Sequence, residues 1–339
     1  RFQRTGFIPV WLGKFKFFMM NSFVVIYWIL LAIFSPVSYC CLSLMMNGVV
    51  IMVKVSVLMP VYNTPEEYLR PAMESILAQT YRDFEFVILN DASTDENVEK
   101  IIKSYSDKRI RYYKNDVNRG ISFSRNRLNE LAKGEYLAVF DHDDISFPTR
   151  LEKEAAFLDN HSEVGVVGSW YQAFDKDKVR KFPTDDAAIK RGLMSGCVIS
   201  HTSAMIRKSV LLGCHISYEE AFSPAEDYAL WCRLLSKTNF ANIPEALVAY
   251  RCHAGNTSHR QSYKMTLATY GILDFVRKEN PALWEMAKSL RGKSYKVKLF
   301  NFIPIFKVCC EADILNCKLF GFLPLFSIRM KTYKKKPAA

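Results

Sequence analysis

The sequence predicts an α/β fold in which a mainly parallel sheet carries helices on both faces. The prediction rests on two observations. Short apolar runs rich in β-branched residues alternate with helical segments from residue 55 to residue 144, and polar residues follow each run at its carboxyl end. Because parallel strands are joined by crossover connections, the intervening helices must cover the sheet.

The first unit begins with the β-branched run Val55–Pro60. Thr64, Pro65 and Glu67 then have the spacing of a helix start, with Thr64 as N-cap, Pro65 at the first helical position and Glu67 closing a capping box. We therefore expect a strand followed at once by a helix.

The alternation continues along the chain. The second strand is expected at Phe84–Leu89, and Ser93 with Glu96 has the spacing of a second capping box. A third strand is expected at Ile110–Lys114 and a helix at Ile121–Leu131. Ligands of such sheets bind beyond the carboxyl ends of the strands, so the polar residues there are the candidates for a site.

The fourth strand ends at Phe140 and runs directly into Asp141, Asp143 and Asp144. Three carboxylates within four residues repel one another, which favours a bound cation, and hard oxygen ligands suit Mg²⁺ or Mn²⁺. The alternative is structural, with Asp144 acting as the N-cap of a following helix.

Motifs in a fixed order run from Lys54 to Ser258. They are VLMPVYN at 57–63, VILNDASTD at 87–95, NRG at 118–120 with RN at 125–126, DHDD at 141–144 before Pro148, AEDYALW at 225–231 and YRCH at 250–253. This series resembles family 2 inverting glycosyltransferases with the GT-A fold, which is Rossmann-like. The chain departs from the family at Asn90, where two consecutive aspartates are common, and at His142, where a small residue is common.

The resemblance implies a site for a UDP-sugar donor. It implies uracil and ribose contacts for Pro60, Tyr62, Asn63 and Asp91. Asp141 would lie beside the ribose, Asp143 would bind the Mn²⁺ or Mg²⁺ that bridges the diphosphate, and His142 could influence donor choice. His253 could bind metal or diphosphate, although a lone histidine after a strand is also a common surface residue. Arg125 could contact phosphate or be a solvated charge.

The resemblance also implies that Asp227 is the general base, since direct displacement at an anomeric carbon requires one for the incoming hydroxyl. The structural alternative is a first-turn anion favoured by the helix dipole. Ser223 and Glu226 have the spacing of a capping box, which gives Glu226 a structural explanation. His201 lies in a segment that the acceptor could pass.

Three function classes remain. The first is an inverting glycosyltransferase that moves a hexose from a UDP-sugar to a glycan or lipid-linked acceptor in cell-surface polysaccharide synthesis. A sugar-nucleotide nucleotidyltransferase would be expected to carry a glycine-rich phosphate loop after the first strand, where this chain has Pro60–Asn63. A non-catalytic, membrane-bound glycan-binding protein would need neither Asp143 nor Asp227.

The positive charge is concentrated in the terminal segments. Of the formal net charge of +12, residues 288–339 carry +10 and residues 1–50 carry +4, which leaves −2 for the rest. This distribution argues against nucleic acid as a partner of the main domain. The segment KLFNFIPIF at 298–306 returns as KLFGFLPLF at 318–326, and basic-aromatic segments favour an anionic membrane surface. The alternative is a tail that packs on its own domain.

Three regions are therefore expected: a hydrophobic N-terminal segment at 1–51, the glycosyltransferase domain at 52–290, and a basic amphipathic tail at 291–339. Phe17–Val53 contains no charged residue, and we expect either a membrane hairpin broken at Pro36 or a non-native extension. Nine cysteines without a C-x-x-C pair favour a reducing compartment. The expected location is the cytoplasmic face of the membrane.

Overall fold

The computed structural model describes residues 53–174, 178–253, 256 and 261–290, and the backbone of 294–299, 303–311, 314–319 and 323–329. All of them belong to the compact unit Val53–Ala339. The hydrophobic N-terminal segment expected at 1–51 lies outside the described residues. Within the described part of the chain, no helix has both the length and the apolar character needed to cross a membrane.

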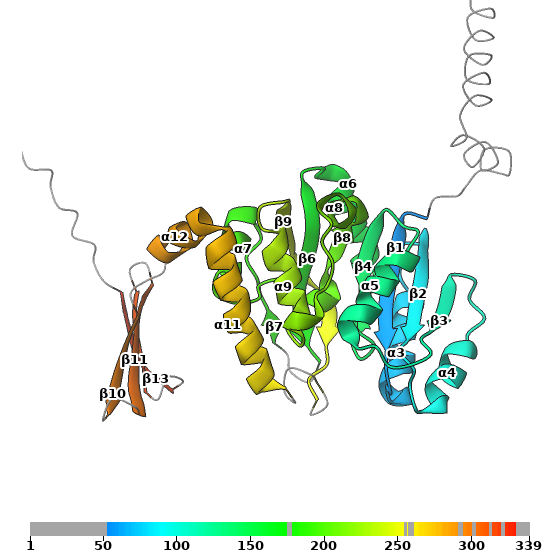
Figure 1. Cartoon of the computed structure of the whole chain (residues 1–339), viewed down its shortest axis with the longest axis horizontal. Helices are drawn as coiled ribbons and strands as arrows, with labels where there is room; N and C mark the ends of the chain where they lie inside the picture. Colours follow the sequence, from blue (N-terminus) through cyan, green and yellow to red (C-terminus); the bar gives the residue numbers. More distant parts are fainter. Residues whose placement is uncertain are drawn as a thin grey trace, which may run out of the picture. The chain divides into compact units, whose positions relative to one another are not determined.

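One half of the main sheet is parallel, as predicted. Its strands are β1 (Val55–Val61), β2 (Phe84–Asn90), β3 (Ile110–Lys114) and β4 (Tyr136–Val139). They lie in the order β3-β2-β1-β4 and pair in parallel throughout (Figure 1). The carboxyl ends of β1, β2 and β4 therefore meet at one edge of the sheet.

The other half of the sheet is mixed, so the expectation of a mainly parallel sheet is wrong here. Its strands are β5 (Ile145–Ser146), β6 (Val164–Ala173), β7 (Val179–Arg180), β8 (Met205–Arg207) and β9 (Asn239–Tyr250). β8 is antiparallel to β4 and β6, β5 is antiparallel to β9, and β7 is antiparallel to β6, whereas β6 and β9 are parallel. An apolar run buries both faces of a central strand in either direction, so the hydrophobic pattern does not encode strand direction.

Helices cover both faces of the sheet, as predicted. On one face α3 (Glu66–Leu77), α4 (Glu96–Lys103) and α6 (Arg150–Asn160) pack in one apolar cluster with Val57 and Met59 of β1. On the other face Leu58 packs in a second cluster, since successive strand residues point to opposite faces. The helices of that cluster are α5 (Ile121–Leu131), α7 (Asp186–Leu193), α8 (Lys208–Cys214), α9 (Glu226–Leu234), α11 (Ser262–Glu279) and α12 (Pro281–Leu290). Two short 3₁₀ helices, η1 (His201–Ser203) and η2 (Glu220–Phe222), complete this region.

The capping boxes expected at the first two helices are wrong. α3 begins after Pro65 without a side-chain cap, and the cap of α4 is Asp95, which accepts from Asn97 N at 2.9 Å. Ser93 is used elsewhere, because its hydroxyl accepts from Asn63 N at 2.9 Å. The contact between the two strand-end loops thus takes precedence over the local helix cap.

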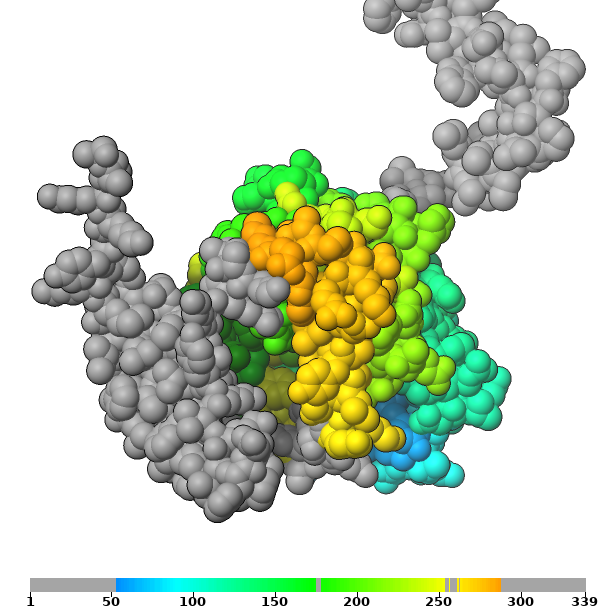
Figure 2. All heavy atoms as spheres, turned by 60° about the vertical axis from the view of Figure 1, so that its left-hand side comes forward, coloured from blue at the N-terminus to red at the C-terminus, as the bar shows by residue number. Residues whose placement is uncertain are grey.

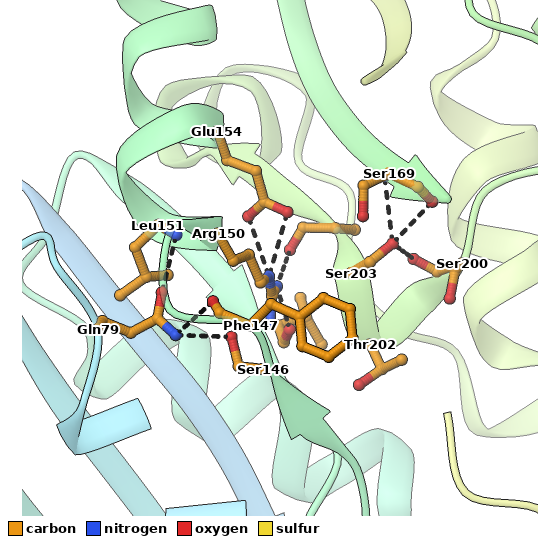
Figure 3. Close-up of polar contacts among 12 residues, drawn as sticks. Gln79, Ser146, Phe147, Arg150, Leu151, Glu154, Ser169, Ser200, Thr202 and Ser203 are labelled. Atoms are coloured by element: carbon orange, nitrogen blue, oxygen red, sulfur yellow. Dashed lines mark hydrogen bonds and ion pairs between the residues drawn. The ribbon is translucent and has the colours of Figure 1, made fainter. Parts of the chain in front are cut away.

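A buried polar layer supports the end of β4 (Figure 3). Arg150 is fully buried, pairs with Glu154 one helical turn later at 3.1 Å, and donates from Nη2 to the carbonyl of Val139 at 2.8 Å. Gln79, two residues after the end of α3, donates to Phe147 O at 2.8 Å and accepts from Leu151 N at 3.0 Å. Because Val139 lies two residues before Asp141, this layer fixes the strand from which the acidic segment, residues 141–144, departs.

The repeated C-terminal segment forms two equivalent hairpins. The strands β10 (Ser294–Leu299), β11 (Ile303–Glu311), β12 (Ile314–Leu319) and β13 (Leu323–Arg329) make a four-stranded antiparallel sheet. Lys298 is opposite Pro304 in the first hairpin and Lys318 is opposite Pro324 in the second, each next to a register shift. The sequence repeat is therefore also a repeat of backbone structure.

Candidate functional site

A cleft of about 980 Å³ opens at the carboxyl ends of β1, β2 and β4. All ten residues selected from the sequence line this one cleft: Pro60, Tyr62, Asn63, Asp91, Arg125, Asp141, His142, Asp143, Asp227 and His253. Residues from α9 and from the segment after β9 thus meet the strand-end loops of the parallel half. The structure brings together groups that are up to about 190 residues apart in the chain, as tertiary folding must for any such site.

Asn63 joins the loops after β1 and β2. Its backbone has φ +48°, a left-handed conformation that asparagine tolerates better than most residues. Its side-chain oxygen accepts from Thr94 N at 2.8 Å and from Asp95 N at 3.2 Å. The neighbouring Tyr62 is 45% exposed and lines the cleft.

Asp91 is almost fully buried at the end of β2. Its carboxylate accepts from Asn115 Nδ2 at 2.6 Å, from Arg119 N at 2.9 Å and from Gly120 N at 2.9 Å. These bonds hold the loop that precedes α5 against the strand end. Asp91 therefore shapes this wall of the cleft in addition to lining it.

The acidic segment is held by the strand and helix ends around it. Asp141 N donates to Thr202 Oγ1 at 3.2 Å, and Arg251 donates from Nε to Asp143 O and from its backbone N to Asp144 Oδ1, both at 2.8 Å. Asp144 is fully buried, and burial together with the charges of Asp143 and Asp141 raises its pKa. It is not the N-cap of a helix, since α6 begins six residues later, after Thr149. That structural alternative is wrong.

Asp143 and His253 form the pair best suited to a cation. Asp143 Oδ2 lies 2.9 Å from His253 Nε2 across the cleft. A carboxylate oxygen and an imidazole nitrogen are both common ligands of divalent cations. No cluster of three or more metal-ligating side chains occurs among the described residues. The residues present thus fit an ion whose other ligands are phosphate oxygens and water, as is usual for Mg²⁺.

Arg125 links the two acidic parts of the cleft. Its guanidinium donates from Nη1 to Glu226 and from Nη2 to Asp141 Oδ1 at 3.1 Å. The side chain is 10% exposed, so the interpretation as a solvated helix charge is wrong. The flanking carboxylates raise the pKa of Arg125 against the effect of burial. Arg125 is therefore a fixed positive charge between Asp141 and the start of α9.

Asp227 opens α9 beside Glu226 and is partly exposed to the cleft. Burial and the neighbouring Glu226 carboxylate together raise the pKa of Asp227 to about 6, and the charge of Arg125 opposes this shift. A carboxylate with that pKa is mostly ionised at neutral pH yet basic enough to take a proton. The capping box expected for Glu226 is wrong, because α9 has Ala225 as N-cap and no side-chain cap, and Glu226 turns to Arg125 instead.

His201 lies deeper in the same cleft. It is buried, and its Nε2 is 2.9 Å from the hydroxyl of Tyr218. Sequence reasoning gave His201 little weight and missed Tyr218 and its contact with Arg125, whose guanidinium lies 5.6 Å from the Tyr218 ring centre. Tyr218 lies in a loop outside every motif, so no local signal could have identified it.

Comparison with known proteins identifies the family of this chain. Residues 56–212 match the family model described as glycosyl transferase family 2. An uncharacterized glycosyltransferase of Methanocaldococcus jannaschii is 35% identical over 258 residues, which cover 73% of this chain and 85% of that protein. The O-antigen biosynthesis glycosyltransferase WbnJ of Escherichia coli is 29% identical, with 66% of this chain and 89% of WbnJ covered.

Solved structures show the same fold. TarS of S. aureus in complex with UDP-GlcNAc superposes with a TM-score of 0.54 at 21% identity, covering 69% of this chain and 79% of TarS residues in that structure. In the UDP complex of TarS the match covers 65% of each chain. The mannosyltransferase PcManGT of Pyrobaculum calidifontis, in complex with GDP-Man and Mn²⁺, has a TM-score of 0.52 at 15% identity. The match covers 70% of this chain and 73% of PcManGT in that structure. The fold thus resembles that of GT-A glycosyltransferases, and the chain belongs to glycosyl transferase family 2.

Proposed function

We propose that this glycosyltransferase transfers a hexose from a UDP-sugar to a hydroxyl of a glycan or lipid-linked acceptor, with inversion, during cell-surface polysaccharide synthesis. The observation that carries the proposal is the single cleft in which Asp143, Arg125 and Asp227 meet. The UDP and UDP-GlcNAc complexes of TarS support the choice of donor. The assignment of WbnJ to O-antigen biosynthesis supports the class of acceptor.

The donor half of the cleft would hold the nucleotide. Tyr62 presents an exposed ring for the uracil, while Pro60, Asn63 and Asp91 shape the wall beside it. Asp141 would lie beside the ribose, with Arg125 holding its carboxylate in place. His142 lines the same cleft, and its buried Nδ1 has no hydrogen-bond partner within the described residues.

Asp143 and His253 would hold Mn²⁺ or Mg²⁺, and the Mn²⁺ complex of PcManGT supports that choice. When bound, such an ion supplies positive charge to the departing diphosphate. Arg251 keeps the acidic segment in position for it through its bond to Asp143 O.

Asp227 would accept the proton of the acceptor hydroxyl as that oxygen attacks the anomeric carbon. Its raised pKa, about 6, suits a base that must be ionised before it acts. Since the attack and the departure of UDP occur on opposite faces of the sugar in a single displacement, an α-linked donor would give a β-linked product.

A panel of UDP-hexoses, with Mn²⁺ and glycan acceptors, tests the proposal. The full chain should release UDP only when both its donor and an acceptor are present. A nucleotidyltransferase would instead consume a nucleoside triphosphate and release pyrophosphate, and a glycan-binding protein would release neither product. Either of those results contradicts the proposed activity.

We further propose that the chain works at the cytoplasmic face of an anionic membrane. The basic C-terminal segments supply the charge. Near the cleft, the outer surface of α11, yellow in Figure 2, exposes Tyr263, Leu267 and Tyr270 on one stripe of the helix, and aromatic and aliphatic side chains of this kind can enter a lipid interface.

Vesicle sedimentation tests the association with an anionic membrane. The full chain should bind phosphatidylserine-containing vesicles more tightly than neutral ones, and added salt should weaken the binding. Replacing Lys334, Lys335 and Lys336 by glutamine should weaken it too. Equal binding of both vesicle types would contradict the proposal.

A further inference from the structure

A buried histidine faces the cleft with one nitrogen uncommitted. His201 Nδ1 has no hydrogen-bond partner within the described part of the chain and lies 4.0 Å from Asp141 Oδ1. An unpaired buried imidazole nitrogen is costly, which favours a ligand group at this position. An oxygen atom about 2.8 Å from both Nδ1 and Oδ1 would form an angle of roughly 90° with them. One hydroxyl group can satisfy this geometry by accepting from the imidazole and donating to the carboxylate.

The partners of His201 set the direction of these bonds. Burial raises the pKa of the Tyr218 phenol, and burial with the nearby charge of Arg125 lowers the pKa of His201, so the phenol keeps its proton and the imidazole is neutral. If the Tyr218 hydroxyl donates to Nε2 at 2.9 Å, the remaining proton must be on Nδ1. Nδ1–H is then a donor facing the acceptor Asp141.

The position of this pair points to one part of the donor. Asp141 is two residues from Asp143, on the side of the diphosphate. His201 bonds to Tyr218, whose ring centre lies 5.6 Å from the Arg125 guanidinium that pairs with Glu226 at the start of α9. The transferred sugar must lie between the leaving group and the base. A hydroxyl held by both Asp141 and His201 therefore belongs to that sugar.

We propose that His201 and Asp141 together bind one hydroxyl of the transferred hexose, and that Tyr218 fixes the His201 tautomer that does so. The proposal rests on the proposed function. It makes His201 a determinant of donor-sugar selection, and Tyr218 a positioning residue behind it.

Two substitutions of His201 separate its nitrogens. In His201→Asn the amide occupies the place of Nδ1 and can still donate to the sugar, whereas in His201→Gln it reaches the place of Nε2 and leaves the sugar side without a donor. Tyr218→Phe keeps the ring beneath Arg125 but removes the hydroxyl that selects the tautomer.

Calorimetry with Mn²⁺ measures the dissociation constants for UDP and for the UDP-hexose that the parent transfers. The ratio of the two constants reports the contribution of the sugar. We expect His201→Gln to lower the preference for UDP-hexose over UDP about 3- to 10-fold with UDP affinity unchanged, the usual effect of one hydrogen bond. Tyr218→Phe should lower the preference less, and His201→Asn least.

Other outcomes overturn the proposal. If UDP and UDP-hexose weaken equally, His201 contacts the ribose or supports the fold, and if the ratio is unchanged in both His201→Gln and Tyr218→Phe, the hydroxyl contact does not exist. If the parent binds UDP-hexose and the variants give either of these two results, only the hydroxyl contact is excluded and the proposed function stands. A parent that binds no UDP-sugar contradicts the proposed function itself. Should His201→Gln fail to fold, as judged by circular dichroism, Tyr218→Phe gives the same test.

Discussion

Two buried arginines lie on either side of the acidic segment, and they differ in what surrounds them. Arg150 lies wholly inside the core and pairs with Glu154 of its own helix. Arg125 forms part of the cleft wall and pairs with Glu226, from a helix 101 residues away, and with Asp141. The same ion-pair chemistry thus serves the fold in one region and sets the charge of the cleft in the other. Changes in the cleft should affect activity, and changes in the core layer should affect stability.

The largest effect is expected in the cleft. Asp227→Asn keeps the size of the side chain but removes the proton acceptor, so turnover should fall by about 10² to 10⁴. Donor affinity should hardly change, because the loss is confined to the transition state. Steady-state kinetics, calorimetry and NMR of the product's anomeric proton measure these quantities. An unaffected turnover, or retention of the donor's configuration, would exclude Asp227 as the base of a single displacement.

The core layer should respond in stability. Arg150→Met leaves the Glu154 charge buried without its partner, so the free energy of unfolding should fall by about 3–5 kcal/mol. The double variant Arg150→Met/Glu154→Leu should recover most of that loss. Urea titrations compare the three proteins. A double variant as unstable as the single one would mean that Arg150 acts mainly through its bond to Val139 O.

The same variant gives a check by pH. Burial raises the pKa of Glu154 to about 7, above its ordinary 4.5, although Arg150 holds it down. Without Arg150 the folded-state pKa rises further, so Arg150→Met should be more stable at about pH 5.5, where Glu154 is protonated, than at about pH 8. Stability that is lost instead on acidification would contradict this sign.

A third change concerns the metal. Asp143→Ala should remove the gain in UDP affinity that Mn²⁺ gives, while the urea midpoint stays near that of the parent, since Asp143 belongs to neither apolar core cluster. The parent in EDTA is the matched control and should bind UDP as weakly as the variant does in Mn²⁺. If UDP binding by Asp143→Ala still depends on Mn²⁺, the ion is bound by ligands other than Asp143.

The smallest effect is a shift of the pH profile. Turnover should rise with pH through about 6 as Asp227 loses its proton. Its neighbours are Glu226, which raises this pKa, Arg125, which lowers it, and Asp141, which raises it slightly. Glu226→Gln removes the negative charge that raises the pKa of Asp227 and leaves the positive charge of Arg125, which lowers it. The acidic limb of the pH–turnover profile should therefore move to lower pH. A limb that stays in place or moves upward would show that another group controls it.

The sequence predicted the parallel half of the fold well for a physical reason. Each strand, its helix and the polar residues at its end are local, and the ends of parallel strands must meet, so Tyr62, Asp91 and Asp143 could be assigned to one cleft in advance. The contacts of Arg125 with Glu226 and of His201 with Tyr218 could not be predicted from the sequence, because they depend on how β8 and α9 join the sheet. The expected capping boxes were wrong for the same reason, since tertiary contacts used Ser93 and Glu226 elsewhere.

Asp91 has one more consequence, for where an anion can bind. The amino end of a helix after a strand is the usual phosphate cradle of α/β folds, because its free N–H groups and dipole attract negative charge. At α5 part of this position is already taken, since Asp91 accepts from Arg119 N and Gly120 N, the two N–H groups just before the first helical residue, at 2.9 Å each. A side chain of the protein therefore competes there with any bound anion. A phosphate at this helix end would have only the N–H groups of the first turn of α5 left to it.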